Sequence, residues 1–542
     1  MKTKAKLIDY LSICSLLVFL IYIVSIFFVN FLGRDLVNFD IYSDAILTKY
    51  IATEKTLFPE GWHFGNQVYV IAPPVLGAFF YFFVMESYLS LCLASCVMNL
   101  LCVFTYIWAI KPFAKNRSII ISLLIIIGAT TVGGTAYGDV NGLQVFYTMA
   151  SYYSCYIIGI FFTLGVCFRI MNNISVRKIV LLIALFLSFA LGIQSLREML
   201  VLNLPLFAIS LFILIIYKFS GKELSHQKKN ITFVFLTLIA NTCGLLFEKL
   251  LVFGGKINQR TILKEANGGL IENIKNSVYS FLEYIGLYKP ENIHQLFEVF
   301  VSLFLIFIIA MATISIIIKC FKKGNISAIE FGVLFFVVSL IAVFCSGIFI
   351  LKLRPLYYFC WYPLAAFSLC YIVDKECKKA NVLKNWAVIV LIFISILNYK
   401  PLFYSGLKNI SELQNCYRDI SEKLLDDDIK YIYSDCTTAK NVISTASFDE
   451  ITYVTLDFSN NPVDLWTSFD YLYHDSWFDK ENFDKAFIVI SDKMLEKLDS
   501  DYSQEYKEEF LSNLELVYVL DGYDVELYFF RGSAKMFNDM VK

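Results

Sequence analysis

The chain has 542 residues, of which 58% are hydrophobic and 17% aromatic, and its mean hydropathy is +0.63. This composition excludes a soluble globular enzyme and predicts a polytopic membrane protein. Charge divides the chain: 33 Lys and Arg stand against 19 Asp and Glu up to Pro401, and 13 against 28 beyond it. A basic part suits anionic lipid and an acidic part suits water, so the two parts are expected in different environments.

Several apolar runs are long enough to cross about 30 Å of hydrocarbon, which takes about 20 helical residues. About eleven spans are predicted, near residues 9–32, 88–110, 118–136, 147–169, 178–196, 199–217, 231–252, 297–320, 328–351, 356–373 and 386–399. Basic loops, such as 111–117, 169–178 and 218–229, are assigned to the cytoplasm by the positive-inside rule. The N-terminus is then inside and the tail outside.

One apolar stretch, Val68–Val84, is predicted not to cross. It contains Pro73, Pro74 and Gly77, and counting it as a span would place every later basic loop outside. Broken backbone is tolerated at membrane depth only where protein buries it or a wet cavity borders it. We therefore expect this stretch to re-enter or to lie along the interface. The alternative is that it spans and a later segment does not.

The sequence predicts a mainly α fold in two parts, a polytopic membrane domain at 1–401 and a small extracytoplasmic α/β domain at 402–542. The membrane domain has two large outside loops, 33–87 and 253–298, and the middle of the second favours an amphipathic helix on the membrane face. In the tail, strand-like runs alternate with helical patterns. The predicted strands are Tyr431–Tyr433, Ile451–Phe458, Ala486–Ile490, Leu516–Leu520 and Val525–Phe530, and the predicted helices are Asn409–Leu425 and Asp492–Leu511.

Five acidic residues stand in the first outside loop: Asp35, Asp40, Asp44, Glu54 and Glu60. Ionisable groups at a membrane mouth are costly and therefore indicate chemistry or transport. Asp44 is the favoured catalytic base and Asp40 the second candidate. The other three are expected at the interface. The alternative is that all five are ordinary solvated carboxylates.

The layout around these acids resembles the GT-C superfamily of membrane glycosyltransferases, which includes the protein mannosyltransferases and the aminoarabinose transferases. A first span is followed by an outside loop with acids, an alanine-containing helix, a proline and a broken apolar segment. The residues that carry the resemblance are Phe39 to Ala45, Tyr50, Ala52 and Leu57 to Trp62. A second large outside loop after the seventh span agrees with it. The family often has two adjacent acids here, whereas Ser43 precedes Asp44 in this chain.

The resemblance implies an enzyme that moves a sugar from a polyprenyl-phosphate donor to a cell-envelope glycan, polymer or lipid acceptor on the outer face of a bacterial cytoplasmic membrane. A carboxylate such as Asp44 suits the chemistry, because a base must take the proton of the acceptor hydroxyl as its oxygen attacks the anomeric carbon. A single base fits direct displacement with inversion. Asp40 and Asp44 together with phosphate are also candidate ligands for Mg²⁺ or Mn²⁺.

The departing lipid phosphate calls for nearby cations. Arg197 stands in a short outside turn beside Glu198, and the alternative is that the two pair to fix the turn. Lys352 and Arg354 precede a late span, and the resemblance implies that an arginine near Arg354 contacts lipid phosphate. Tyr357 follows them, either as a substrate contact or in an interfacial aromatic belt.

Three further residues are candidate sugar contacts. Trp62 and His63 end the family-like stretch, and Asp139 lies in a glycine-rich outside segment, 133–142, that is otherwise typical of a tight turn. The acidic tail argues against nucleic acid as a partner. Two alternative functions remain: a polysaccharide polymerase or ligase acting on lipid-linked oligosaccharide, which would rely on arginine and histidine, and a transporter or flippase, which would carry charges within its spans.

Overall fold

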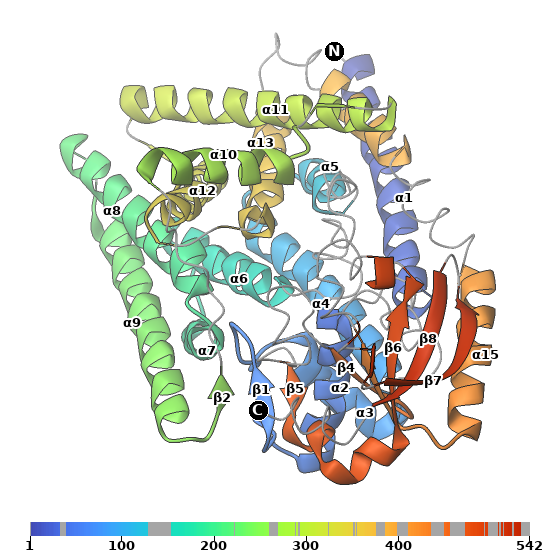
Figure 1. The fold of residues 1–542 in the computed structure, drawn as a ribbon. Helices are drawn as coiled ribbons and strands as arrows, with labels where there is room; N and C mark the ends of the chain where they lie inside the picture. Colours follow the sequence, from blue (N-terminus) through green and yellow to red (C-terminus); the bar gives the residue numbers. More distant parts are fainter. Residues whose placement is uncertain are drawn as a thin grey trace.

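The computed structural model places most of the chain in regular elements (Figure 1). The residues that it describes are 2–32, 39–127, 153–221, 223–259, 269–287, 289–290, 293–323, 325–350, 353, 355–375, 385–397, 410–434, 449–455, 472–492, 494–496, 508, 511–512, 514–522 and 525–532.

The N-terminal three quarters of the chain are mainly helical. The helices are α1 (Lys2–Leu32), α2 (Phe39–Glu54), α3 (Pro73–Val84), α4 (Ser87–Ile110), α5 (Asn116–Ile127), α6 (Ser154–Met171), α7 (Lys178–Gln194), α8 (Leu204–Phe219), α9 (Ser225–Phe253), α10 (Leu270–Tyr284), α11 (Ile293–Lys323), α12 (Ala328–Phe349) and α13 (Trp361–Asp374). A short π-helix, Met199–Asn203, precedes α8, and a 3-10 turn, Pro355–Tyr358, precedes α13. A further apolar helix, Asn385–Leu397, follows α13.

Eight helices in the described part of the chain are long and apolar enough to cross a membrane, and four apolar helices are shorter. Each of the eleven predicted spans overlaps one of these helices, although 128–136 and part of the fourth span lie outside the described residues. The chain is therefore a multi-pass integral membrane protein with the mainly helical fold that the sequence predicts. The predicted helix in the second outside loop is α10.

The broken apolar stretch forms the short helix α3. It starts at Pro73, which has no N–H to leave unpaired in a first turn, and it has 12 residues. At 1.5 Å per residue it is about 18 Å long, well short of the ~30 Å hydrocarbon layer. Met85 then turns the chain with a left-handed backbone, φ 55°. The length of α3 agrees with the expectation that it does not cross.

Two glycines let α7 and α9 cross closely. A Cβ atom on Gly192 would lie 2.3 Å from the carbonyl oxygen of Asn241, and one on Gly244 would lie 2.1 Å from that of Phe189. Only glycine permits such an approach of two apolar helices. The crossing fixes the C-terminal end of α7, from which the chain turns toward Arg197.

The C-terminal part carries a five-stranded mixed sheet of order β4-β3-β6-β8-β7. Strands β4, β3 and β6 are parallel, and β8 and β7 continue the sheet antiparallel. The sheet confirms all five predicted strands. Its elements are β3 (Tyr431–Ser434), β4 (Thr452–Thr455), β6 (Ala486–Ser491), β7 (Leu514–Gly522) and β8 (Val525–Gly532), with α15 (Ile410–Asp426) and the 3-10 turns Asp475–Phe478 and Lys480–Lys485. Helix α15 matches the first predicted helix, whereas most of Asp492–Leu511 lies outside the described residues.

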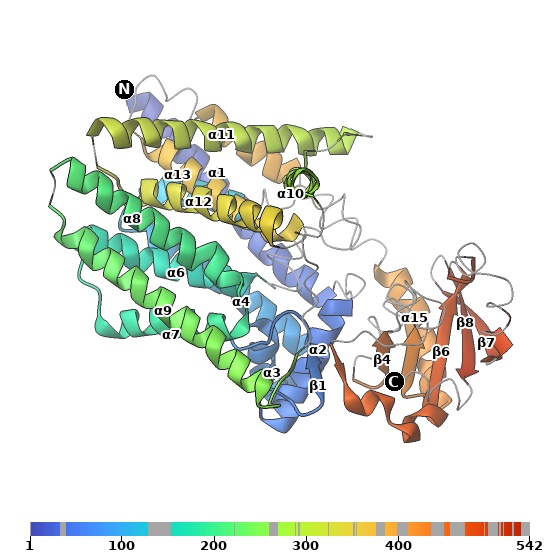
Figure 2. The same cartoon turned by 60° about the vertical axis from the view of Figure 1, so that its left-hand side comes forward.

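A second, small sheet joins segments that are far apart in the sequence. Strand β1 (Trp62–Phe64) pairs in parallel with β2 (Asn258–Gln259) and antiparallel with β5 (Tyr473–His474). One continuous apolar core contains α2, β1 and the strands of the five-stranded sheet. The C-terminal domain consequently lies against the first loop, at one end of the helices (Figure 2).

Candidate functional site

Arg197 projects from the turn between α7 and the π-helix at Met199–Asn203. Its guanidinium lies 4.8 Å from the ring centroid of Tyr153, 5.4 Å from that of Tyr156 and 5.3 Å from that of Tyr357. Aromatic faces attract a cation and hold it without neutralising its charge. The backbone N–H of Arg197 donates to the Ser195 hydroxyl at 3.0 Å, which fixes the turn. The structure thus brings two predicted site residues, Arg197 and Tyr357, together.

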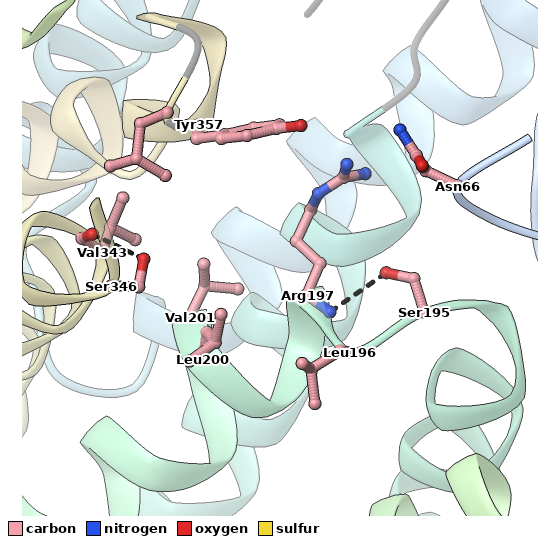
Figure 3. A pocket seen from close by; sticks show the side chains of 10 residues that line it. Asn66, Ser195, Leu196, Arg197, Leu200, Val201, Val343, Ser346 and Tyr357 are labelled. Atoms are coloured by element: carbon pink, nitrogen blue, oxygen red, sulfur yellow. Dashed lines mark hydrogen bonds between the residues drawn. The ribbon is translucent and has the colours of Figure 1, made fainter. Parts of the chain in front are cut away.

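A cavity of about 80 Å³ opens beside this arginine. Its walls are mainly apolar, and the polar heads of Arg197, Tyr357 and Asn66 gather on one side of it (Figure 3). The remaining lining residues are Ser195, Leu196, Leu200, Val201, Val343, Ser346 and Leu353. A half-buried cation at the rim of an apolar cavity suits a ligand that has an anionic head and a hydrocarbon body.

The positive charge of Arg197 is not neutralised by its neighbour. Glu198 is fully buried and faces away, accepting hydrogen bonds from Ser188 Oγ at 3.2 Å and from Asn241 Nδ2 at 2.7 Å. The interpretation of Arg197 and Glu198 as a turn-fixing ion pair is therefore wrong. Across the described residues, Arg197 forms no ion pair with any carboxylate, so its charge is available to an external anion.

Hydrogen bonds connect Arg197 to the first large loop, 33–87. Its Nη1 donates to Gln67 Oε1 at 3.1 Å, and the Tyr156 hydroxyl donates to the same oxygen at 3.1 Å. Because both bonds use the amide oxygen, the amide nitrogen of Gln67 is left to donate to Tyr69, with which Gln67 forms a further hydrogen bond. Tyr69 in turn bonds the carboxyl group of Asp44.

Asp44 ends this chain of hydrogen bonds, on α2. It is 2% exposed, and its Oδ1 has no hydrogen-bond partner in the structure as described. Burial raises the pKa of Asp44 well above its ordinary value, the hydrogen bond from Tyr69 opposes the rise, and the charge of Asp40 adds to it. Asp40 lies one helical turn earlier, at the i and i+4 spacing that places side chains on one face. A raised pKa makes the ionised carboxylate of Asp44 a stronger proton acceptor than an ordinary aspartate, which suits a general base.

Gln194 fixes the loop that contains Gln67 and Tyr69. Its Oε1 accepts the backbone N–H groups of Val70 and Ile71 at 3.2 and 3.1 Å, and its carbonyl oxygen accepts that of Val68 at 3.2 Å. Our sequence analysis missed Gln67, Tyr69 and Gln194, because single neutral polar residues have no motif. Their one signal is position, since they stand at the boundaries of apolar segments.

Trp62 and His63 lie at the junction with the C-terminal domain. Trp62 is 1% exposed and packs edge to face on Trp477, with ring centroids 5.9 Å apart. His63 stacks on Tyr473 at 4.2 Å, and its Nε2 lies 2.7 Å from Asp475 Oδ1. These contacts join the first loop to the tail, and neither residue is among those that line the cavity beside Arg197. The prediction that they contact sugar stays untested.

Three predicted site residues, Asp139, Lys352 and Arg354, lie outside the described residues. The described residues contain no group of three or more His, Cys, Asp or Glu side chains arranged to hold a metal ion. Asp40 and Asp44, the two protein ligands of the predicted Mg²⁺ or Mn²⁺ site, both lie on α2. Phosphate was expected as the third ligand, and the metal site stays a prediction.

The class defined by fold and site is a multi-pass membrane protein with an α/β C-terminal domain and an arginine at the rim of an apolar cavity. No family model matches the chain. No curated protein matches its sequence. Among solved structures, the chain is similar to the crystal structure of ArnT from Cupriavidus metallidurans bound to undecaprenyl phosphate, with a TM-score of 0.49 and 9% sequence identity over 95% of this chain and 97% of that chain.

Proposed function

We propose that this protein is a membrane glycosyltransferase that moves a sugar from a polyprenyl-phosphate donor to a hydroxyl group of a cell-envelope glycan, polymer or lipid on the outer face of the membrane. One observation carries the proposal: the unneutralised guanidinium of Arg197 at an apolar cavity is connected by hydrogen bonds, through Gln67 and Tyr69, to the buried carboxyl group of Asp44.

In this proposal Arg197 binds the donor phosphate. As the bond from the anomeric carbon to the phosphate oxygen breaks, the diester becomes a monoester and gains negative charge. A guanidinium held in place by three aromatic rings stabilises that charge without having to reorganise. Leu200 and Val201 offer an apolar wall to the first isoprenyl units. Arg354 and Lys352 are proposed as further phosphate contacts.

Asp44 is the proposed base. The acceptor oxygen attacks the anomeric carbon, its proton passes to Asp44, and the phosphate leaves with the bonding electrons, which inverts the anomeric centre. Because Asp44 is buried and bonded to Tyr69, the acceptor hydroxyl reaches it by displacing Tyr69 or through the Tyr69 hydroxyl. Burial keeps the pKa of Asp44 high, and the charge of Asp40, on the same helix face, adds to this effect.

The test is transfer of labelled sugar from a polyprenyl-phosphate donor in proteoliposomes. We expect Asp44→Asn and Arg197→Ala each to lower the rate at least 100-fold, since general bases contribute about 10²- to 10⁴-fold. Asp40→Asn should lower the rate less, because it removes a charge beside the base and leaves the base itself in place. Glu60→Gln, in the same loop but exposed, is the matched control and should keep the wild-type rate.

The polymerase or ligase alternative shares Arg197 but not Asp44. Full activity of Asp44→Asn and Asp40→Asn, together with loss of activity in Arg197→Ala, would refute the base and favour that alternative. Retained activity in Arg197→Ala would instead show that Arg197 does not bind the donor phosphate. The proposal would then lose the observation on which it rests.

A further inference from the structure

A second cavity, of about 590 Å³, lies at the other end of the helices from Arg197. It is bordered by the last turns of α11 and α13 and by the first turn of α12. Helix α12 contributes Glu330 to this cavity and Ser346 to the cavity beside Arg197. At 1.5 Å per residue the two positions are about 24 Å apart. Figure 2 shows the first turn of α12 on the side away from the C-terminal domain.

The two acidic groups at this cavity are already engaged. Both carboxylate oxygens of Glu330 accept from Lys319 Nζ, at 2.7 and 2.8 Å, and Glu330 also accepts the backbone N–H of Ser327 in a capping box. Asp374 Oδ1 accepts from the backbone N–H of Lys115 and from the Ser118 hydroxyl. The donors to Asp374 are neutral, so its charge remains, and the three lysines that line the cavity, Lys319, Lys322 and Lys375, exceed the two carboxylates, Glu330 and Asp374, by one positive charge.

Two lysines of the same cavity have no carboxylate partner within the described part of the chain: Lys322 on α11 and Lys375 at the end of α13. Lys375 Nζ lies 2.7 Å from Ser315 Oγ and 3.4 Å from the Tyr371 hydroxyl, so two hydroxyl groups stand beside its charge. Two ammonium groups with neighbouring hydroxyls form the kind of donor set that phosphate oxygens accept.

The helix that carries Lys322 also presents an apolar surface. Ile314, Ile317, Ile318 and Phe321 are all more than two fifths exposed, and Ile318 also lines the cavity. A ligand bound here therefore meets cations at its head and hydrocarbon along its body. Free phosphate has only the anionic group, whereas an anionic phospholipid has both an anionic head and hydrocarbon chains.

We propose that this cavity binds the phosphate headgroup of an anionic membrane lipid, with its acyl chains along the exposed face of α11. Basic pockets between membrane helices on the cytoplasmic side recognise such headgroups through their local positive potential. The site is independent of the chemistry proposed at Arg197, because it lies at the opposite end of the helices.

The test measures binding of dioctanoyl phosphatidylglycerol to the full chain in neutral detergent, with dioctanoyl phosphatidylcholine and inorganic phosphate as comparison ligands. Wild-type protein should bind the glycerol lipid, and Lys322→Gln/Lys375→Gln should bind it roughly 10- to 30-fold more weakly. Lys228→Gln/Lys229→Gln removes the same charge from exposed positions on α9 and should bind as the wild type does. If the first double variant does not fold, Lys322→Gln alone, at an exposed side chain, should still weaken binding several-fold.

Three results would overturn the proposal. Equal affinity of the cavity variants and the wild type would show that the lysines do not hold the lipid. Equal binding of phosphatidylcholine would show that the headgroup charge is not recognised. Inorganic phosphate that binds as tightly as the lipid would assign the cavity to a free anion. None of these results depends on sugar transfer, so each is separate from a failure of the proposed function.

Discussion

Asp44 is held in surroundings that oppose its ionisation. One of its carboxylate oxygens bonds Tyr69 while the other has no partner in the described structure, and the side chain is almost completely buried. Leaving a buried charge half satisfied destabilises a fold. Such local destabilisation is found at functional sites, where activity limits stability.

Replacing Asp44 with Asn should therefore stabilise the protein at alkaline pH while abolishing transfer. The folded-state pKa of Asp44 lies above its unfolded value, so its favourable contribution is present at acid pH and is lost as pH rises through the folded pKa. We expect the unfolding temperature of Asp44→Asn, relative to wild type, to rise by about 2–4 °C between pH 5 and pH 8. Thermal unfolding in detergent at several pH values measures it, and a difference that is constant with pH would contradict the raised pKa.

Tyr69 partly offsets the effect of burial on the pKa of Asp44. Tyr69→Phe removes the hydrogen bond that lowers the pKa of Asp44, so that pKa should rise further. The base works when ionised, and the acidic limb of the pH profile of transfer should therefore move upward by about 1–2 pH units, given the worth of a hydrogen bond to a charged group. Tyr10→Phe, on the exposed surface of α1, is the control and should leave the profile in place. If the acidic limb does not move in Tyr69→Phe, Tyr69 does not affect the pKa of the base.

At the scale of elements, the crossing of α7 and α9 supports the arginine site. Asn241 of α9 donates to the carbonyl of Ser188 on α7 at 3.0 Å and to Glu198, next to Arg197. The close approach that permits these bonds depends on Gly192 and Gly244. The position of Arg197 is thus set by backbone packing between two apolar helices.

Gly244→Ala should disturb this arrangement. Its Cβ would meet the Phe189 carbonyl oxygen at 2.1 Å, which the helices can relieve only by moving apart. We expect a loss of about 1–3 kcal/mol in the free energy of unfolding, the usual cost of overpacking, together with slower transfer. Gly269→Ala, whose Cβ has no neighbour within 4 Å, is the matched control. Wild-type stability and rate in Gly244→Ala would show that the crossing can relax freely.

Trp477 joins the C-terminal domain to the first loop. It is 2% exposed, packs on Trp62, and donates its indole N–H to the Tyr50 hydroxyl at 3.1 Å. Truncating a buried Trp to Ala costs about 3–5 kcal/mol, so Trp477→Ala should expose the junction and speed proteolysis of the tail. Trp386→Ala removes a Trp that is 62% exposed and should leave the cleavage rate unchanged. Equal cleavage rates of the two variants would show that Trp477 does not stabilise the junction.

Periodicity predicted the elements well and their contacts poorly. The strand Ala486–Ser491 is fully buried and has a continuous apolar sequence. Helices α11 and α12 are long and apolar because each side faces either protein or membrane hydrocarbon, and both settings leave a local signal in the sequence. Trp62 and His63 gave no sign of their partners, which lie about 400 residues later in the chain. The roles of Gln67 and Gln194 could not be predicted either, because they arise only from contacts between segments that are distant in the sequence.

At the scale of the whole molecule, the two cavities lie at opposite ends of the helices, and the C-terminal domain covers the first loop at the end that carries Arg197. This arrangement determines which features share a side of the membrane. If the basic loops face the cytoplasm, then Arg197, the first loop and the five-stranded sheet share the outer side, and the lysine-lined cavity faces the inner leaflet.

Cysteine labelling tests this polarity directly. In a background without native cysteines, Glu515→Cys on the exposed edge strand β7 should react with a membrane-impermeant maleimide in intact cells, because the sheet is expected outside. Lys228→Cys, exposed near the start of α9, should react only after lysis, because its basic loop is expected inside. Labelling is read by gel shift, with both variants labelled in detergent as the reference for full reaction. The reversed pattern would move the proposed active site to the cytoplasmic face, and with it the donor, since a polyprenyl-phosphate sugar has to present its headgroup on the side where Arg197 and Asp44 lie.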